Sequence, residues 1–353
     1  MSYPAIRVNL EKLACNTKAL VEKCGKSGID VVPVTKVYCG IPEIAKASVS
    51  AGAKMLADSR IENIIKLKDI NIPKLLLRIP MLSQVDEIVE HVDISLNSEY
   101  EVIKALSEKS LKKGKVHKVI LMVDIGDLRE GVWYENAVES AGRILELKGI
   151  ELIGIGTNLT CYGAVIPSKD NLGLLVSITE KIESKYNIKL SIISGGNSSS
   201  IYMIEKNEIP KGINQLRLGE SIVLGYETAY GDKIEGTWQD VFTFLAEIVE
   251  LKEKPSIPIG KTGVDAFGEK PVFTDRGVRK RAILAAGRQD VKIDGIKPRD
   301  KDAIVLGASS DHLIIDVSDC KKEYKVGDVL EFDMDYGALL AAFTSGYVHK
   351  IIE

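Results

Sequence analysis

The sequence has few cysteines, no long apolar run and almost no net charge, and each absence excludes a class of protein. Its five cysteines are scattered, with no Cys-x-x-Cys pair and no cluster with histidine, so we expect neither a disulfide framework nor a zinc site. No stretch approaches the ~20 apolar residues that span a bilayer. The first residues also lack the basic and apolar regions of a signal peptide. We therefore expect a reduced, cytoplasmic protein that does not enter a membrane.

The charge balance argues against nucleic acid as a partner. The chain has 47 basic and 50 acidic residues, a formal net charge of -3, so it carries no global field that would attract a polyanion. Hydrophobic residues make up 45% of the chain and charged residues 27%, as in ordinary globular proteins. The length of 353 residues fits two ordinary domains or one barrel with an appendage.

The first two-thirds of the chain alternates short β-branched runs with segments of helical periodicity. Apolar residues recur every three or four positions in stretches such as 99–106 and 136–147, which is typical of amphipathic helices. Candidate strands lie at residues 30–35, 54–57, 74–79, 93–96, 116–124, 151–159, 190–194 and 214–218. This count and spacing predict an α/β fold, a (β/α)8 TIM barrel. A doubly wound open sheet shares the same local pattern and is the alternative.

The pattern changes after about residue 230. Candidate strands at residues 241–251, 281–286, 303–306, 312–317 and 328–334 are separated by turns rich in Gly, Pro and Asp, without a convincing long helix. We predict a barrel over residues 1–235, followed by a mostly β C-terminal domain over residues 236–353. The first few residues of the chain could join the β domain.

Polar residues at the predicted strand ends are the candidate functional residues, because barrel enzymes carry their chemistry where strands end and βα loops begin. Lys36 follows the first strand, where partial burial would favour the neutral amine that Schiff-base chemistry requires; a plain exposed lysine is the alternative. Arg129 follows the fifth strand and could bind an anion or phenolate, or simply lie on the surface. Residues 156–163, after the sixth strand, form either a satisfied polar turn or the lining of a pocket.

Two loops rich in glycine and serine follow the seventh and eighth strands. Residues 194–200 read Ser-Gly-Gly-Asn-Ser-Ser-Ser before a helix, where free N–H groups and hydroxyls suit a phosphate. A serine N-cap after a glycine turn is the simpler alternative. Residues 216–221 read Leu-Arg-Leu-Gly-Glu-Ser. Because barrels often hold phosphate between these two loops, the pair is more informative than either segment alone.

Signatures of other cofactors are missing from the sequence. Residues 154–159 fail the third position of a dinucleotide fingerprint, and there is no Walker loop. The four histidines have no metal-ligand spacing. We therefore predict no metal site, and a nicotinamide enzyme is disfavoured.

A lysine after the first strand, phosphate loops after the seventh and eighth, and a following β domain together resemble the fold-type III pyridoxal-phosphate enzymes. Residues 57–60, 77–81, 158–163 and 194–200 are similar to the alanine racemase family, and to its alanine/ornithine racemase branch in particular. The resemblance extends over essentially the whole chain. It implies pyridoxal 5'-phosphate as cofactor and a head-to-tail homodimer, in which the β domain of one subunit closes the barrel mouth of the other.

The resemblance also implies roles for matching residues. Lys36 matches the lysine that holds the cofactor covalently and serves as one base, and Arg129 matches the arginine that contacts the phenolic oxygen and the substrate carboxylate. Arg217 matches the arginine beside the pyridine nitrogen. A guanidinium stays protonated and keeps that nitrogen unprotonated, which suits return of the proton to Cα rather than transamination. The other cofactor contacts that the resemblance implies are Asn158, Asn197, Ser198, Gly219, Glu220 and Tyr336.

This chain departs from the family at three of the matching positions. Asn158 stands where a histidine stacks on the cofactor ring, and Met122 stands where a modified lysine lies. Arg288 stands where a tyrosine acts as the opposite-face base, and an arginine does not readily lose a proton.

The second base must therefore come from another residue. The candidates are His312, Cys161 and Tyr162, and an imidazole is the best suited of these to proton transfer near neutral pH. His312 could equally be a polar strand residue paired with Asp311.

The sequence thus predicts a racemase that interconverts L and D amino acids by two-base proton transfer at Cα, with ornithine preferred over lysine or alanine. The predicted substrate contacts are Arg129, Ser310 and Asp311. Acidic residues that could receive a second ammonium group are Asp265, Glu269, Asp290 and Asp311. A decarboxylase of the same fold type is the enzymatic alternative. A non-catalytic pyridoxal-phosphate-binding protein is the other alternative, although such single-barrel proteins stop after the barrel.

Overall fold

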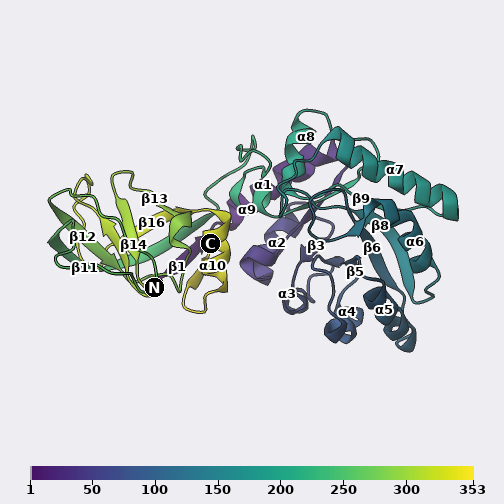
Figure 1. The fold of residues 1–353 in the computed structure, drawn as a ribbon, viewed down its shortest axis with the longest axis horizontal. Helices are drawn as coiled ribbons and strands as arrows, with labels where there is room; N and C mark the ends of the chain where they lie inside the picture. Colours follow the sequence, from purple (N-terminus) through teal and green to yellow (C-terminus); the bar gives the residue numbers. More distant parts are fainter. Residues whose placement is uncertain (1) are drawn as a thin grey trace. The chain divides into compact units, whose positions relative to one another are not determined.

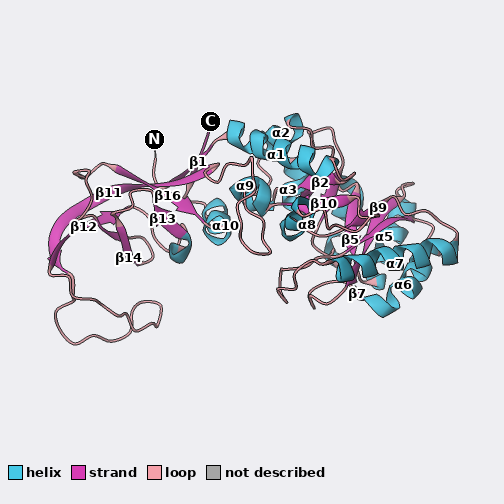
Figure 2. Cartoon of the chain, turned by 90° about the horizontal axis from the view of Figure 1, so that it is seen from above, coloured by secondary structure: helices cyan, strands magenta, loops and turns pink. Residues whose placement is uncertain are grey.

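The computed structural model describes residues 2–353, which divide into two compact units. One unit is Leu10–Gln239, and the other joins residues 2–9 to Asp240–Glu353. Figure 1 and Figure 2 show the helices and strands of each unit. Among residues 2–353, no helix combines the length and the apolar character needed to cross a bilayer.

Eight parallel strands form a nearly closed barrel in the first unit. They are β2 (Asp30–Pro33), β3 (Leu56–Asp58), β4 (Lys74–Leu76), β5 (Ile94–Asn97), β6 (His117–Asp124), β8 (Ile150–Gly156), β9 (Ile192–Ser194) and β10 (Gln215–Leu218). The spatial order is β2-β10-β9-β8-β6-β5-β4-β3, and a parallel bridge between Val34 and Ala57 joins its two ends. The predicted barrel is confirmed, and the open sheet is excluded because its two edges would not meet.

The helices of this unit follow the strands in alternation. They are α1 (Leu10–Gly25), α2 (Pro42–Ser50), α3 (Ile61–Lys66), α4 (Val85–His91), α5 (Tyr100–Lys112), α6 (Ala137–Leu145), α7 (Lys169–Tyr186), α8 (Ile201–Glu205) and α9 (Glu220–Leu224). Short 3-10 turns precede or replace helices at η1 (Lys36–Tyr38), η2 (Leu82–Gln84), η3 (Tyr134–Asn136) and η4 (Ser198–Ser200), and the short strand β7 (Val132–Trp133) pairs with β6.

Local sequence accounts for the clearest of these helices. Ser168 caps α7: its hydroxyl accepts from the Asn171 N–H at 3.2 Å, and the Asn171 side chain accepts from the Ser168 N–H at 2.8 Å. The helix ends at Asn187, whose positive φ is tolerated better by asparagine than by most residues. Its apolar residues face the barrel at helical spacing.

The barrel interior is filled by apolar side chains from alternate positions of the strands, namely Val32, Val34, Ala57, Leu75, Ile94, Leu96, Ile120, Met122 and Ile153. Close packing of these branched residues makes the barrel a solid core rather than a pore. Met122 is fully buried among them, so a thioether fills this position of the core. The polar residues are left to the carboxyl ends of the strands.

The second unit is mostly an antiparallel sheet, as predicted. Its strands are β1 (Ala5–Val8), β11 (Phe242–Pro255), β12 (Val278–Leu284), β13 (Ile296–Pro298), β14 (Ile304–Ala308), β15 (Leu313–Asp316), β16 (Val329–Met334) and β17 (His349–Ile352). The order is β13-β16-β11-β12-β15-β14, and β1 pairs with β11 and β17. The turn η5 (Ile293–Gly295) precedes β13, and the helix α10 (Tyr336–Thr344) follows β16.

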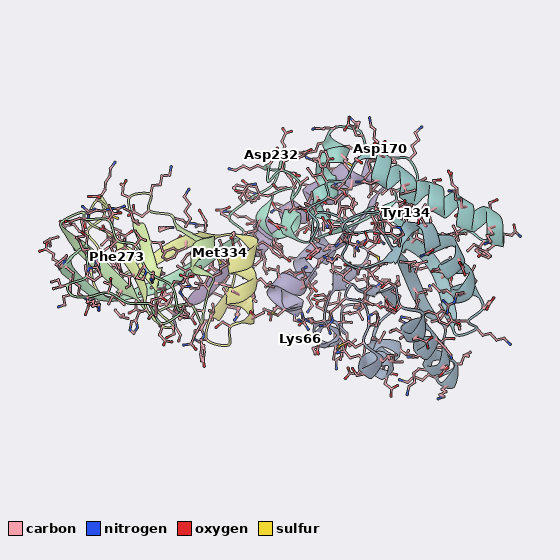
Figure 3. The ribbon with its side chains drawn as sticks, in the orientation of Figure 1. Lys66, Tyr134, Asp170, Asp232, Phe273 and Met334 are labelled. Atoms are coloured by element: carbon pink, nitrogen blue, oxygen red, sulfur yellow. The ribbon has the colours of Figure 1, made fainter. Side chains whose placement is uncertain are left out.

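A long loop, residues 256–277, connects β11 to β12 and extends away from the sheet (Figure 2). Its apolar side chains are unusually exposed: Ile259 is 92% and Val272 is 94% exposed, and Phe273, labelled in Figure 3, is 42% exposed. Such residues in one loop are typical of a surface that meets another molecule.

Candidate active site

Lys36 begins η1, shortly after the first barrel strand β2, and the residue is exposed at the carboxyl end of the barrel. The turn that carries it is held from both sides. The buried Thr35 hydroxyl donates to the Asp58 carboxylate at the end of β3. Lys66, labelled in Figure 3, donates to the Cys39 carbonyl at 2.9 Å and to Asn63 Oδ1 at 3.2 Å. The backbone of Lys36 is therefore fixed at the carboxyl end of the barrel.

Asp58 is the buried carboxylate under this turn. It accepts hydrogen bonds from the Arg60 N–H at 2.9 Å and from Asn63 Nδ2 at 3.1 Å, in addition to the Thr35 hydroxyl. Burial raises the pKa of Asp58, and the hydrogen bonds offset part of that effect. Burial, and then the nearby Asp58 carboxylate, raise the pKa of Tyr38, so this phenol stays protonated in the core beside Lys36.

Arg217 lies on β10 with its guanidinium buried, at 4% exposure. Nη1 donates to the Ser194 hydroxyl at the end of β9, and Nη2 donates to the Thr157 carbonyl at 2.7 Å after β8. Burial lowers the pKa of Arg217 to about 10, so the group stays protonated at neutral pH. Gly156 leaves the space beside it open, since a Cβ there would lie 3.5 Å from Arg217 Nη1 and 3.1 Å from the Ser194 Cβ.

Asn158 is the point where three loops meet. Its Oδ1 accepts from Asn197 Nδ2 at 2.9 Å, and its own Nδ2 donates to Cys161 Sγ at 3.1 Å. Asn197 Nδ2 also donates to the Leu159 carbonyl at 2.9 Å. The same Asn158 amide adjoins Arg129. In the opposite amide orientation, which replaces the Oδ1 and Nδ2 bonds just described, its oxygen accepts from Arg129 Nη1 at 2.9 Å. The structure thus brings the predicted residues Arg129, Asn158, Cys161 and Asn197 together.

Arg129 itself forms an ion pair with the neighbouring Glu130. Burial alone would lower the pKa of Arg129, but the Glu130 hydrogen bond and nearby negative groups outweigh it and raise that pKa. The guanidinium therefore remains a cation, as recognition of a carboxylate or phenolate requires.

The two predicted phosphate loops are also joined. The Ser198 hydroxyl lies 3.0 Å from the Ser221 hydroxyl and accepts from the Ser221 N–H at 3.1 Å. Asn197 caps η4 by accepting from the Ser199 N–H at 2.8 Å, and Gly219 is the N-cap of α9. Two helical starts, with Glu220 opening the second, therefore point toward neighbouring positions at the mouth of the barrel.

Two buried hydroxyls at this end of the barrel, Ser199 Oγ and Thr157 Oγ1, have no hydrogen-bond partner among residues 2–353. Buried polar groups are rarely left unpaired in proteins. This end of the barrel therefore offers hydrogen-bond donors from unpaired hydroxyls, two guanidinium groups and two helical starts. Such donors suit a phosphate ester that carries a basic ring, and Lys36 supplies an amine that can react with an aldehyde. The residues present fit pyridoxal phosphate.

Asp127 is a residue of this site that the sequence analysis missed. Its carboxylate is buried, at 1% exposure, and accepts backbone hydrogen bonds from Tyr162 at 3.0 Å, Val165 at 3.2 Å and Cys161 at 3.3 Å. It therefore connects the loop after β6 to the loop after β8. An aspartate in a loop with Gly and Asp neighbours is an ordinary turn residue by sequence, and its partners are N–H groups that no side-chain pattern announces.

Other predicted residues lie outside this cluster. Tyr162 follows Cys161, but its side chain is 76% exposed. Ser310, Asp311, His312 and Tyr336 belong to the unit that contains the antiparallel sheet. There, Asp311 Oδ1 accepts from Gln289 Nε2 at 2.6 Å, and the His312 N–H donates to the Ser309 hydroxyl at 3.2 Å. His312 is exposed and lies just before β15.

Arg288, at the position of the expected tyrosine, contacts residues of the β domain. Its Nε donates to the Ala308 carbonyl at 3.2 Å, and its guanidinium lies 4.4 Å from the Phe267 ring centre and 4.0 Å from a Glu269 oxygen. It attaches the 256–277 loop to the sheet. Asp290 is buried and accepts from the Gly287 N–H at 2.9 Å, and burial raises its pKa. Asp265 likewise accepts N–H groups of its own loop, from Phe267 at 2.8 Å and Glu269 at 2.9 Å.

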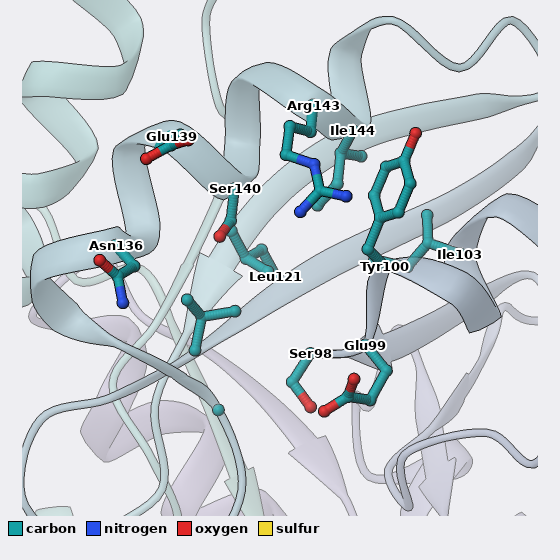
Figure 4. A pocket seen from close by; sticks show the side chains of 12 residues that line it. Ser98, Glu99, Tyr100, Ile103, Leu121, Asn136, Glu139, Ser140, Arg143 and Ile144 are labelled. Atoms are coloured by element: carbon teal, nitrogen blue, oxygen red, sulfur yellow. The ribbon is translucent and has the colours of Figure 1, made fainter.

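A separate cavity of about 420 Å³ lies on the outer side of the barrel and contains none of the predicted site residues (Figure 4). Its wall includes Gly131 and Val132, just after Arg129. The Arg143 guanidinium in this wall stacks 3.9 Å from the Tyr100 ring centre. Among residues 2–353 there is no group of three or more His, Cys, Asp or Glu side chains that could hold a metal ion.

Comparison with known proteins identifies related sequences. The family model "Alanine racemase, N-terminal domain" matches residues 8–227. The chain is 52% identical to an ornithine racemase of Acetoanaerobium sticklandii over 99% of both proteins. It is 45% identical to a lysine racemase of Thermotoga maritima, over 100% of this chain and 99% of that protein.

Solved structures with low sequence identity share the fold. An alanine racemase of Clostridium difficile 630 superimposes with a TM-score of 0.76 at 18% identity, covering 100% of this chain and 96% of that chain. An alanine racemase of Bartonella henselae with covalently bound pyridoxal phosphate has a TM-score of 0.77 at 16% identity, covering 100% of both chains.

Proposed function

Because this chain belongs to the alanine racemase family, we propose that it interconverts L- and D-ornithine, and acts less well on lysine and alanine. The predictions of a pyridoxal-phosphate-dependent racemase and of its family are confirmed by the full-length racemase relatives. The observation that carries the choice of ornithine is the 52% identity to an ornithine racemase, which extends over 99% of both proteins.

Each residue of the barrel cluster has a task in this reaction. Pyridoxal phosphate, when bound, supplies the electron sink that makes the Cα–H of an attached amino acid acidic. The Lys36 amine would hold the cofactor covalently, and it would take or return a proton at Cα. Arg217 stays protonated and so would donate to the ring nitrogen without giving up its proton. The Ser198 and Asn197 side chains and the N–H groups of Gly219 and Glu220 would hold the phosphate.

Arg129 binds the carboxylate of the substrate and so orients it. Asn158 holds the Arg129 side chain in place. A bidentate guanidinium–carboxylate pair sets both position and rotation of the amino acid. That rotation determines whether the Cα–H bond faces Lys36 or the opposite base, so this pair aligns Cα for proton transfer.

We assign the second proton transfer to His312, and keep Cys161 and Tyr162 as alternatives. A racemase needs one base on each face of Cα, and the exposed His312 imidazole is a side chain that can both accept and donate a proton. Cys161 is supported by its place beside Asn158 and Asn197 in the barrel cluster. Ser310 and Asp311 adjoin His312 in the chain and are proposed to contact the substrate.

We further propose that the protein is a cytoplasmic head-to-tail homodimer, in which His312 serves the barrel of the second subunit. The exposed apolar side chains of the 256–277 loop support an interface, because such side chains are costly in water. All five cysteines are free, which fits a reducing compartment. Light scattering of the purified protein tests the dimer, and a monomeric mass would contradict it.

The central test is racemisation by the purified, cofactor-loaded protein. L-ornithine, L-lysine and L-alanine are supplied separately, and the D form is measured by chiral chromatography. We expect the highest kcat/KM with ornithine, no release of CO2, and loss of the absorbance near ~420 nm in Lys36→Ala. Evolved CO2 without D product would identify a decarboxylase, and a colourless, inactive native protein would end the proposal.

The base assignment needs its own measurement. Exchange of the Cα proton with deuterated solvent reports each half-reaction separately, so His312→Ala should retain exchange from one enantiomer and lose racemisation. Cys161→Ala is the matched variant, and full racemisation in Cys161→Ala is expected. If the outcomes are reversed, the second base is Cys161.

A further inference from the structure

The carboxylate of Asp127 joins two loops of the barrel cluster. One is the loop of residues 124–131, which carries Arg129. The other is the loop of residues 157–168, which carries Asn158 and Cys161. Asp127 Oδ2 accepts from the N–H groups of Tyr162 and Cys161 at 3.0 and 3.3 Å, and Oδ1 accepts from Val165 at 3.2 Å. Its backbone carbonyl accepts from the Gly163 N–H at 3.0 Å.

The loop that carries Asp127 is itself fixed to the barrel, so Asp127 can hold the 157–168 loop in a defined position. Asp124 Oδ1, at the end of β6, accepts from the N–H groups of Gly126 at 2.8 Å and Leu128 at 3.2 Å. At the far end of the loop the backbone returns to the strand, where a Cβ on Gly131 would lie 2.4 Å from the Asp124 nitrogen. Both ends of the 124–131 loop are therefore bound to β6.

The loops that meet at Asp127 contain strained backbone. Leu128, Thr160 and Ala164 have φ values of +56°, +57° and +53°, in the left-handed region that non-glycine residues rarely adopt. Such conformations persist only where the surroundings hold them, and they gather at functional sites. Thr160 and Ala164 lie in the loop whose N–H groups Asp127 accepts.

We propose that Asp127 is a positioning residue for racemisation, which locks the 157–168 loop so that Asn158 holds Arg129 in its working orientation. The path is short. Asp127 fixes the backbone at Cys161 and Tyr162, that backbone places Asn158, and the Asn158 amide lies 2.9 Å from Arg129 Nη1. This inference rests on the proposed function, because Arg129 matters here as the group that orients the substrate carboxylate.

The perturbation is Asp127→Asn, which preserves shape but replaces one oxygen by an NH2 group. That group is a donor facing backbone donors, so at least one of the loop hydrogen bonds is lost. The matched control is Glu227→Gln. Glu227 is equally buried and accepts three backbone N–H groups, from Ala229, Tyr230 and Asp232 at 2.8, 2.9 and 2.8 Å, but its loop carries none of the proposed site residues.

The first measurement is hydrogen–deuterium exchange of the cofactor-loaded enzyme, followed in peptides that span residues 157–168. We expect Asp127→Asn to exchange about tenfold faster there than the native enzyme, and Glu227→Gln to be unchanged in those peptides. Should Asp127→Asn fail to fold, Asp127→Ser keeps one small acceptor and is measured in the same way. Unchanged exchange in a folded Asp127 variant would overturn the locking role.

The second measurement is a double-mutant cycle with Arg129→Lys, using kcat/KM for ornithine. Alone, Asp127→Asn should lower kcat/KM about tenfold or more, mostly through a higher KM, whereas Glu227→Gln should stay within about twofold. In the Arg129→Lys background, Asp127→Asn should cost only about twofold, because its effect passes through the group already removed. Full additivity would show that Asp127 has only a general structural role.

The two hypotheses fail in different ways. If the native enzyme racemises no amino acid, the proposed function falls, and the affinity for pyridoxal phosphate, measured by absorbance titration, takes the place of kcat/KM in the cycle. If racemisation is normal in Asp127→Asn, the proposed function stands and the positioning role is refuted.

Discussion

His117 should make the barrel unit unstable below neutral pH. Its imidazole is buried, at 4% exposure, at the start of β6, and its Nε2 lies 2.8 Å from the Ser95 hydroxyl. Burial lowers the pKa of His117 from its ordinary value of 6.5 to about 4, and Asp93 offsets only part of that effect. The folded protein therefore keeps this imidazole neutral at pH values where the unfolded chain is already protonated.

The sign and the size follow from proton linkage. The folded-state pKa lies below the unfolded value, so as pH falls the unfolded chain binds the proton first. The stabilisation is complete above about pH 6.5 and is lost progressively down to about pH 4. At about 1.36 kcal/mol for each unit of pH, the free energy of unfolding drops by ~2 kcal/mol at pH 5 and by ~3 kcal/mol at pH 4, and the loss approaches ~3.4 kcal/mol at lower pH.

The assay is urea unfolding at pH 7.5, 6 and 5, followed by tryptophan fluorescence. The protein has two tryptophans, Trp133 and Trp238, and both lie in Leu10–Gln239, so the signal reports on the barrel unit alone. His117→Gln cannot gain the charge and should lose ~2 kcal/mol less than the native protein between pH 7.5 and 5. His91→Gln removes an exposed imidazole and is the control. Equal slopes for the native protein and His117→Gln would refute the reasoning.

Three further predictions concern the site. Arg217→Lys keeps the charge but cannot reach both of its acceptors, so kcat/KM should fall about tenfold or more in steady-state racemisation while the cofactor absorbance remains. Gly131→Ala places a Cβ 2.4 Å from the Asp124 nitrogen at a φ of +135°, whereas Gly126→Ala at +127° meets open space; the first should lower Tm several degrees more than the second in thermal unfolding. Thr35→Val removes a hydrogen bond to the buried Asp58 carboxylate and should lower the free energy of unfolding by ~2 kcal/mol in urea. A decrease of only a few tenths of a kcal/mol would show that this hydrogen bond does not stabilise the fold.

The barrel could be predicted from the sequence because its strands are continuous apolar runs that stop at chemically distinctive residues. Buried parallel strands need such runs. Lys36 and the 194–200 loop lie where two of them end, and Arg217 lies within the last one. The alternation of strand-like and helix-like segments also predicted the number of barrel strands. Closure of the barrel depends on the Val34–Ala57 bridge, which no local sequence pattern shows.

The features that the sequence did not predict either depend on distant partners or lack a hydrophobic periodicity. α10 is apolar on nearly every side, so the helical repeat of polar and apolar residues is absent from Tyr336–Thr344. β1 has four residues, too few to be distinguished from a loop by alternation. Asp127 was missed for a different reason, since its contacts are with the backbone of residues 161–165.

The placement of β1 bears on the order in which the protein is synthesised. β1 pairs with β11 on one side and with β17 on the other, and both of these strands follow the whole barrel in the chain. During translation, Ala5–Val8 therefore emerges long before either neighbour exists, while the barrel can complete its own hydrogen bonds. The barrel is in effect an insertion after the first strand of the sheet. Until His349–Ile352 leaves the ribosome, one edge of β1 stays open to pairing with another nascent chain.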